Sequence, residues 1–75
     1  MSYLSVLDKR GDTKLAVWSP ENATEVEIAE KKFNELVLHQ GYAAYELQKN
    51  DQGVVLREFN PHAERIFLMP RAVGG

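Results

Sequence analysis

Near its end the chain reads Arg65-Ile-Phe-Leu-Met69, an apolar run bounded by an arginine and by Pro70. Apolar side chains occupy both parities of this run, so the strand that it predicts has no polar face. Such a strand belongs in the middle of a sheet, and a single helix covers only one of the two sheet faces. The run therefore predicts a central strand, around which the rest of a small domain is arranged.

At the other end of the chain, two β-favouring runs lie close together, Tyr3–Leu7 and Lys14–Trp18. Between them, residues 8–13 contain the Asp and Gly that suit a tight reversal. We expect the two runs to form a hairpin.

A helix follows the hairpin. Its start has two candidate signals, Ser19-Pro20 and the capping-box spacing of Asn22 to Glu25. Gly41 is placed to end it. Between these limits, apolar residues recur at helical spacing and predict one buried face, made of Val26, Ala29, Phe33, Leu36 and Val37.

Two more strands are predicted before the central one. Residues 42–48 alternate, and if Glu46 and Gln48 face water, then Ala43, Tyr45 and Leu47 face the core. Residues 54–59 resemble an edge strand, and residues 60–64 resemble a short capped turn that leads into the last strand.

The resulting order is strand, strand, helix, strand, strand, turn, strand. It resembles the β-grasp fold of ubiquitin-like proteins, in which the first and last strands run parallel at the centre. The expected fold class is α+β, with a mixed four- to five-stranded sheet and one helix packed across it. We expect a ubiquitin-like domain over residues 1–69 and a flexible tail over residues 70–75.

Composition narrows the classes of function. The 75 residues are 44% apolar and include no cysteine, which excludes disulfides and thiolate metal sites. A net charge of −2 without a basic cluster argues against a nucleic-acid partner. No membrane span or secretory signal is apparent, so we expect a cytoplasmic monomer. With no nucleophile–base pair, metal cluster or phosphate-binding loop, we expect no enzyme, metal or cofactor.

The last residues, Met69-Pro-Arg-Ala-Val-Gly-Gly75, resemble the tail of ubiquitin-like proteins. The resemblance implies that an ATP-dependent activating enzyme adenylates Gly75, which then passes, in some systems through a conjugating enzyme, to a target protein. Gly74 would let the tip enter a narrow pocket, because glycine has no Cβ. Arg71 matches an arginine that the activating enzyme of ubiquitin reads, whereas Val73 stands where ubiquitin has a second arginine. That difference and Pro70 favour a dedicated partner enzyme.

Other residues are candidates for partner recognition. If Ile66 and Leu68 face the helix, Phe67 and Met69 face the open side of the sheet, where Trp18 could join them. Two alternatives to a modifier remain open. One is a sulfur carrier with a C-terminal thiocarboxylate, and the other is a non-catalytic interaction domain whose Gly-Gly end is incidental.

Overall fold

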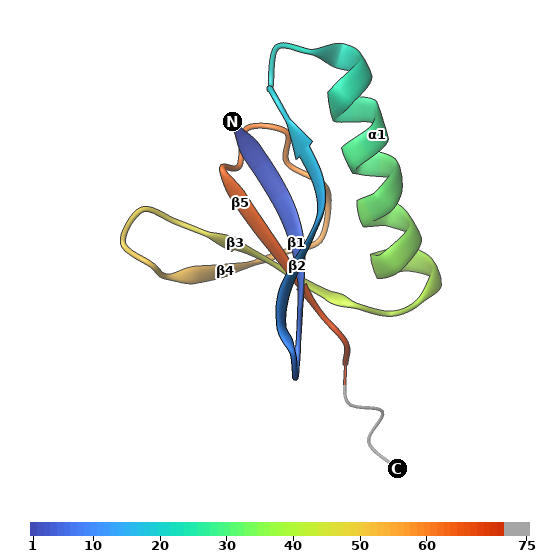
Figure 1. Ribbon diagram of the computed structural model, residues 1–75, viewed down its shortest axis with the longest axis vertical. Coiled ribbons are helices and arrows are strands. Elements are labelled where there is room, and N and C mark those ends of the chain that lie inside the picture. The colour runs from blue at the N-terminus through green and yellow to red at the C-terminus, as the bar shows by residue number, and fades with distance from the viewer. Residues whose placement is uncertain (72–75) are drawn as a thin grey trace.

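The computed structural model describes residues 1–71 and contains one mixed five-stranded sheet with one helix packed across it. Its elements are β1 (Ser2–Asp8), β2 (Gly11–Trp18), α1 (Ala23–Asn34), the π-helical turn η1 (Glu35–His39), β3 (Ala43–Leu47), β4 (Gly53–Leu56) and β5 (Arg65–Met69). The strand order is β2-β1-β5-β3-β4. This is an α+β fold of the β-grasp type, as predicted (Figure 1).

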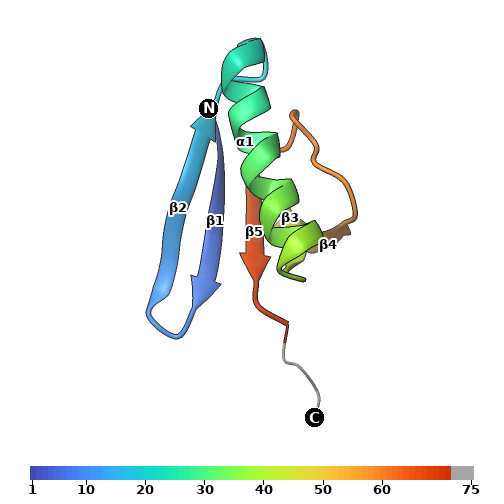
Figure 2. The ribbon, with the colours of Figure 1, turned by 90° about the vertical axis from the view of Figure 1, so that its right-hand side faces the viewer.

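The central position of β5 is confirmed. It pairs in parallel with β1, where Leu4 lies opposite Ile66, and antiparallel with β3, where Ala44 lies opposite Leu68. In Figure 2 the arrows of β1 and β5 point the same way, with the helix in front of the sheet. Ile66 and Leu68 are fully buried beneath the helix, because alternate residues of a strand point to the same face.

Helix α1 begins at the second of its two candidate signals. The Asn22 side chain accepts a hydrogen bond from the backbone N–H of Glu25 at 3.1 Å, which caps the first turn. The Glu25 carboxylate in turn accepts from the backbone N–H of Ser19 at 2.9 Å. Ser19 and Pro20 therefore lead into the helix, and the Glu25 side chain ties this segment to its first turn.

The end of the helical segment is set by a glycine. Gly41 has φ +73°, a left-handed conformation that glycine adopts without a steric penalty. The backbone N–H of Tyr42 then donates to the carbonyl of Leu36 at 3.0 Å, a bond that closes the last turn. The predicted stop is confirmed.

The core lies between the helix and one face of the sheet. The predicted helix stripe supplies Ala29 and Phe33, which are buried, and three side chains that pack against them. Phe59 links the aromatic residues, with its ring 5.1 Å from that of Trp18 and 5.7 Å from that of Phe33. The fully or nearly fully buried apolar residues are Leu4, Trp18, Ala29, Phe33, Ala44, Ala63, Ile66 and Leu68.

The expected inward face of β3 is wrong. Ala44 is buried opposite Leu68, whereas Tyr45 lies opposite Phe67 on the face away from the helix. Glu46, on the same face as Ala44, is half-buried, and its carboxylate accepts a 3.4 Å hydrogen bond from the Asn60 amide. Because a polar partner meets Glu46 there, this side chain does not need to face water.

No helical segment within residues 1–71 combines the length and hydrophobicity that crossing a bilayer requires.

Candidate functional site

The end of β5 is where the chain leaves the sheet. Met69 makes the last pairing of the strand, opposite Ala43 of β3. Pro70 has no N–H to donate to a neighbouring strand, so pairing stops there. Met69, Pro70 and Arg71 are all exposed, and the exit lies at the same end of the sheet as the β1–β2 turn (Figure 2). The chain thus passes from the middle of the sheet to the surface within two residues.

Three of the predicted site residues, Val73, Gly74 and Gly75, lie outside the described residues. Arg71 is the predicted recognition residue nearest to them that the structure places, and its side chain is exposed. From residue 72 onward, the expected flexible tail also lies outside the described part of the chain.

The face of β5 away from the helix carries an aromatic pair. Phe67 is half-buried, and its ring meets that of Tyr3 edge-on, with 6.1 Å between centroids and 88° between planes. The ammonium of Lys14 lies 4.8 Å above the Tyr3 ring. Met69 follows at the same face and is 37% exposed. Phe67 and Met69 therefore lie where the sequence predicts them, next to the exit.

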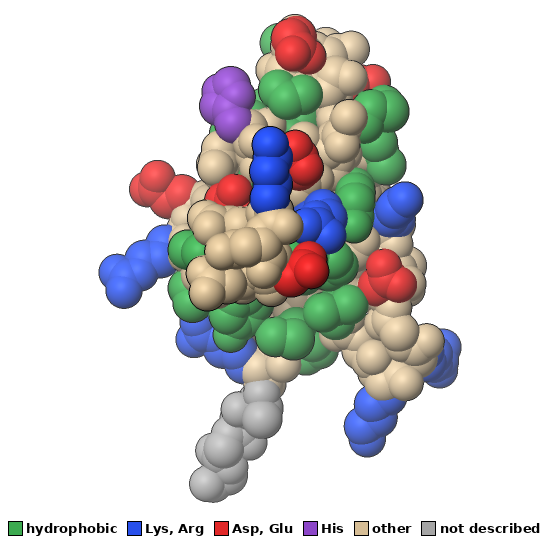
Figure 3. All heavy atoms as spheres, turned by 90° about the vertical axis from the view of Figure 1, so that its left-hand side faces the viewer, with side chains coloured by type: hydrophobic (Ala, Val, Ile, Leu, Met, Phe, Trp, Pro, Cys, Tyr) green, Lys and Arg blue, Asp and Glu red, His purple; other side chains and the backbone are tan. Residues whose placement is uncertain are grey.

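Apolar exposure extends from this pair to both sides of the sheet. Val17 of β2 and Val55 of β4 are 45% and 63% exposed. Each lies opposite an aromatic residue on the side of the sheet away from the helix: Val17 lies opposite Tyr3, and Val55 lies opposite Tyr45. Figure 3 shows hydrophobic side chains gathered on the side away from the helix, several of them near the exit of the chain. We call the side of the sheet away from the helix the open face; it carries Tyr3, Val17, Tyr45, Val55, Phe67 and Met69.

The expected place of Trp18 on the open face is wrong. Trp18 is 0% exposed, and its indole lies under the helix against Phe59. A register shift between Leu4 and Ser5 in the β1–β2 pairing explains the difference. The bulge changes the phase of β2, so that Lys14 faces the open side while Trp18, four residues later, faces the core. A buried Trp18 is not available as a contact residue in the folded chain.

A groove near the exit is lined in part by Arg57, a residue that the sequence patterns did not point to. It has a volume of about 620 Å³ and brings together Arg71 and Arg57. Its apolar walls come from the end of the helical segment and from the paired strands β3 and β4, through Val37, Tyr42, Ala43, Ala44, Tyr45, Val55 and Leu56. No local sequence signal predicts this groove, because Arg57 and Arg71 belong to separate segments that only the sheet brings together.

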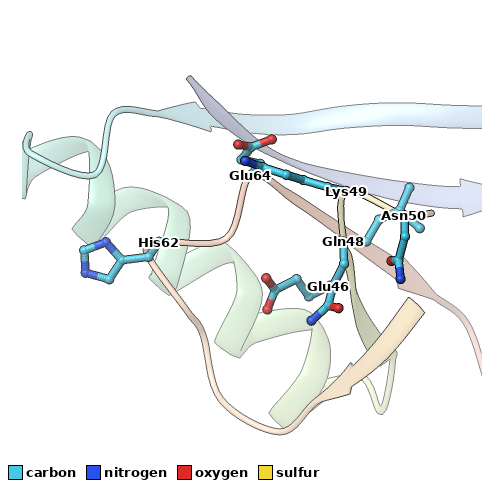
Figure 4. A pocket seen from close by; sticks show the side chains of 7 residues that line it. Glu46, Gln48, Lys49, Asn50, His62 and Glu64 are labelled. Atoms are coloured by element: carbon cyan, nitrogen blue, oxygen red, sulfur yellow. The ribbon is translucent and has the colours of Figure 1, made fainter. Parts of the chain in front are cut away.

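A second, more polar cavity of about 430 Å³ lies at the opposite end of β3. Acidic, basic and amide side chains line it, among them Glu46, Lys49 and Glu64 (Figure 4). The ring of His62 points away from the other labelled side chains. Within residues 1–71, no three His, Asp or Glu side chains gather in a metal-binding arrangement.

Fold and exit together define a small β-grasp-type domain whose central strand delivers the chain to the surface beside an apolar sheet face. No protein-family model matches the chain, and neither the curated proteins nor the solved structures contain a match to it.

Proposed function

We propose that this protein is a ubiquitin-like modifier whose Gly75 carboxylate is activated by a partner enzyme and transferred to a target protein. The observation that supports this most directly is the exit of the chain from β5. Exposed Met69 ends the central strand, exposed Pro70 and Arg71 follow it, and the sequence continues within a few residues to Gly74-Gly75. A partner can therefore contact this exit without unfolding the sheet.

In the proposed reaction the protein is a substrate. The Gly75 carboxylate attacks the α-phosphate of ATP and displaces pyrophosphate, which leaves an acyl adenylate. An enzyme thiol then attacks the acyl carbon, releases AMP and forms a thioester. A lysine amine of the target attacks that thioester, forms an isopeptide bond and returns the thiol. Gly74 and Gly75 suit this series of reactions because each step places the acyl carbon in a confined pocket, where a Cβ would clash.

The open face and Arg71 have the chemistry of a recognition surface for the activating enzyme. Phe67 and Met69 supply apolar contact area beside the exit. Arg71 supplies a guanidinium that can bind a carboxylate through two parallel hydrogen bonds. Val73 would contact the channel that leads to the nucleotide. The sulfur-carrier alternative shares the adenylate. In its second step hydrosulfide attacks the acyl carbon, AMP leaves, and the free protein ends in a thiocarboxylate without transfer to a lysine.

A second candidate function is a non-catalytic interaction domain. The extent of the open face favours it, since Val17, Met69 and Val55 are exposed on three different strands. In that case the Gly-Gly end has no role, and a partner binds the open face alone.

The test is ATP-dependent loading by a cognate activating enzyme, sought for instance among adjacent genes. Intact mass spectrometry of the native protein first establishes its C-terminal residue. Pyrophosphate exchange and thioester formation are then measured for the wild type, for a variant lacking Gly74-Gly75, and for Gly53→Ala as a glycine control far from the exit. We expect loading of the wild type and the control only.

Equal adduct with the shortened variant would overturn the modifier proposal. If loading depends on Gly74-Gly75, the product distinguishes a modifier from a sulfur carrier. An isopeptide-linked lysine identifies a modifier, whereas added sulfur mass on the free protein identifies a sulfur carrier.

A further inference from the structure

The sheet has two edge strands, β2 and β4, and they differ in how they are protected. Helix α1 packs beside β2, and the Lys32 ammonium donates a 3.0 Å hydrogen bond to the carbonyl of Leu15. A bulge also interrupts the pairing of β2 with β1. Lysines, bulges and covering helices are among the features by which natural edge strands resist pairing with another chain. The β2 edge is therefore protected in part.

The β4 edge has none of these features within residues 1–71. No side chain there donates to or accepts from the backbone of Gly53–Leu56, and its pairing with β3 runs without a register shift. Val54 and Val55 point to opposite faces and are 42% and 63% exposed. An edge that offers free backbone groups and an apolar side chain on each face is a template for an added strand.

The groove beside this edge adds charge selectivity. Among residues 1–71, Arg57 and Arg71 are the only charged residues that line it. Neither forms an ion pair with another of residues 1–71, where the one salt bridge joins Arg65 to Asp51. Glu58 follows Arg57 in the chain but does not line the groove. Two guanidinium groups in one groove, in a protein of net charge −2, favour carboxylates on whatever binds there.

We propose that the β4 edge and this groove bind an extended acidic segment of a partner protein, which adds to the sheet as a sixth strand. Backbone hydrogen bonds to β4 supply pairing, Val54 and Val55 contact alternate apolar side chains, and Arg57 and Arg71 pair with the carboxylates. This inference does not rest on the proposed function, because it involves neither Gly74 nor Gly75.

Titration of the ¹⁵N-labelled full chain with defined peptides tests the site. Two acetylated and amidated probes, Thr-Val-Thr-Val-Asp-Asp and its reverse Asp-Asp-Val-Thr-Val-Thr, cover both strand directions. We expect one of them to shift the backbone amide signals of Gly53–Leu56. Arg57→Gln and Arg71→Gln should each weaken binding about two- to fivefold, as loss of one partly exposed ion pair predicts. Lys9→Gln, at the β1–β2 turn, removes the same charge elsewhere and should leave binding unchanged.

Three results would overturn the proposal. The first is no shift of the β4 amides with either acidic probe at millimolar concentration. The second is equal binding of probes in which Asn replaces Asp. The third is reproduction of the same shifts by concentrating the protein alone, which would mean that a second copy occupies the edge. Deleting Gly74-Gly75 should leave peptide binding intact while abolishing loading, so the two proposals fail separately.

Discussion

The indole Nε1 of Trp18 donates a 2.9 Å hydrogen bond to the carbonyl oxygen of Pro61, 43 positions later in the chain. This bond joins the end of β2 to the turn that precedes β5. Phe59 lies against the same indole, so the turn is held by both packing and polar contact. The turn that leads into the central strand β5 is therefore held in place by Trp18 of the edge strand β2.

Trp18→Phe is expected to destabilise the protein by about 2–3 kcal/mol, since it leaves a cavity and an unpaired Pro61 carbonyl. A chain of 75 residues has a total stability of only about 4–11 kcal/mol, so the change in urea midpoint should be large. The neighbouring Val17→Ala is the control and should cost less than about 1 kcal/mol, because Val17 is already 45% exposed. Similar losses for both variants would contradict the central role of the indole.

Ser5→Ala is expected to stabilise the protein. Ser5 is completely buried on β1, and its hydroxyl oxygen has no hydrogen-bond partner within residues 1–71. Removing an unsatisfied buried hydroxyl should raise the free energy of unfolding by about 1 kcal/mol. Equilibrium urea unfolding measures this, and a loss of stability would show that the hydroxyl is hydrogen-bonded in solution.

Substitutions at Gly41 and Gly53 allow the effect of backbone strain on stability to be measured apart from that of steric clash. An added Cβ meets no heavy atom within 4 Å at Gly41 or at Gly53, but only Gly41 has a positive φ, +73°. Gly41→Ala should therefore destabilise the protein by about 1 kcal/mol through backbone strain alone. Gly53→Ala should change the thermal midpoint little. Equal effects would mean that the left-handed conformation does not set the end of the helical segment.

Arg71→Ala separates recognition from stability. Arg71 is exposed beyond the last strand pairing, so the free energy of unfolding should change by less than about 0.5 kcal/mol. If the modifier proposal holds, the rate of loading at limiting protein should fall about threefold or more, as loss of one charge-assisted contact predicts. Arg10→Ala, at the distant hairpin turn, is the matched control. Unchanged loading would remove Arg71 from the recognition surface.

Several features of the fold follow from local sequence patterns. Ile66 and Leu68 are apolar, as are Phe67 and Met69 between and after them, and a strand with this composition is stable only at the centre of a sheet. Ala29 and Phe33 lie on one helical stripe and are buried together. These outcomes depend on residues close in sequence, so their pattern is sufficient to predict them.

The faces of β2 and β3 did not follow from pattern. Alternation predicts which residues of a strand share a face, but a bulge changes the phase within the strand. The shift between Leu4 and Ser5 places Trp18 in the core. In β3, Glu46 meets Asn60 across the fold, which allows a charged residue on the helix side.

By itself, the sequence determined the order of the elements, the helix and the glycine that ends it, the central place of β5 and the short path from that strand to Gly74-Gly75, because each depends on residues that are neighbours along the chain. Only the tertiary structure decided that Trp18 is buried, that the β2 edge is protected in part and the β4 edge is not, and that Arg57 and Arg71 line the same groove. The physical reason is that exposure and pairing depend on which strands become neighbours, and a strand carries no local record of its neighbour or of a bulge in the pairing between them.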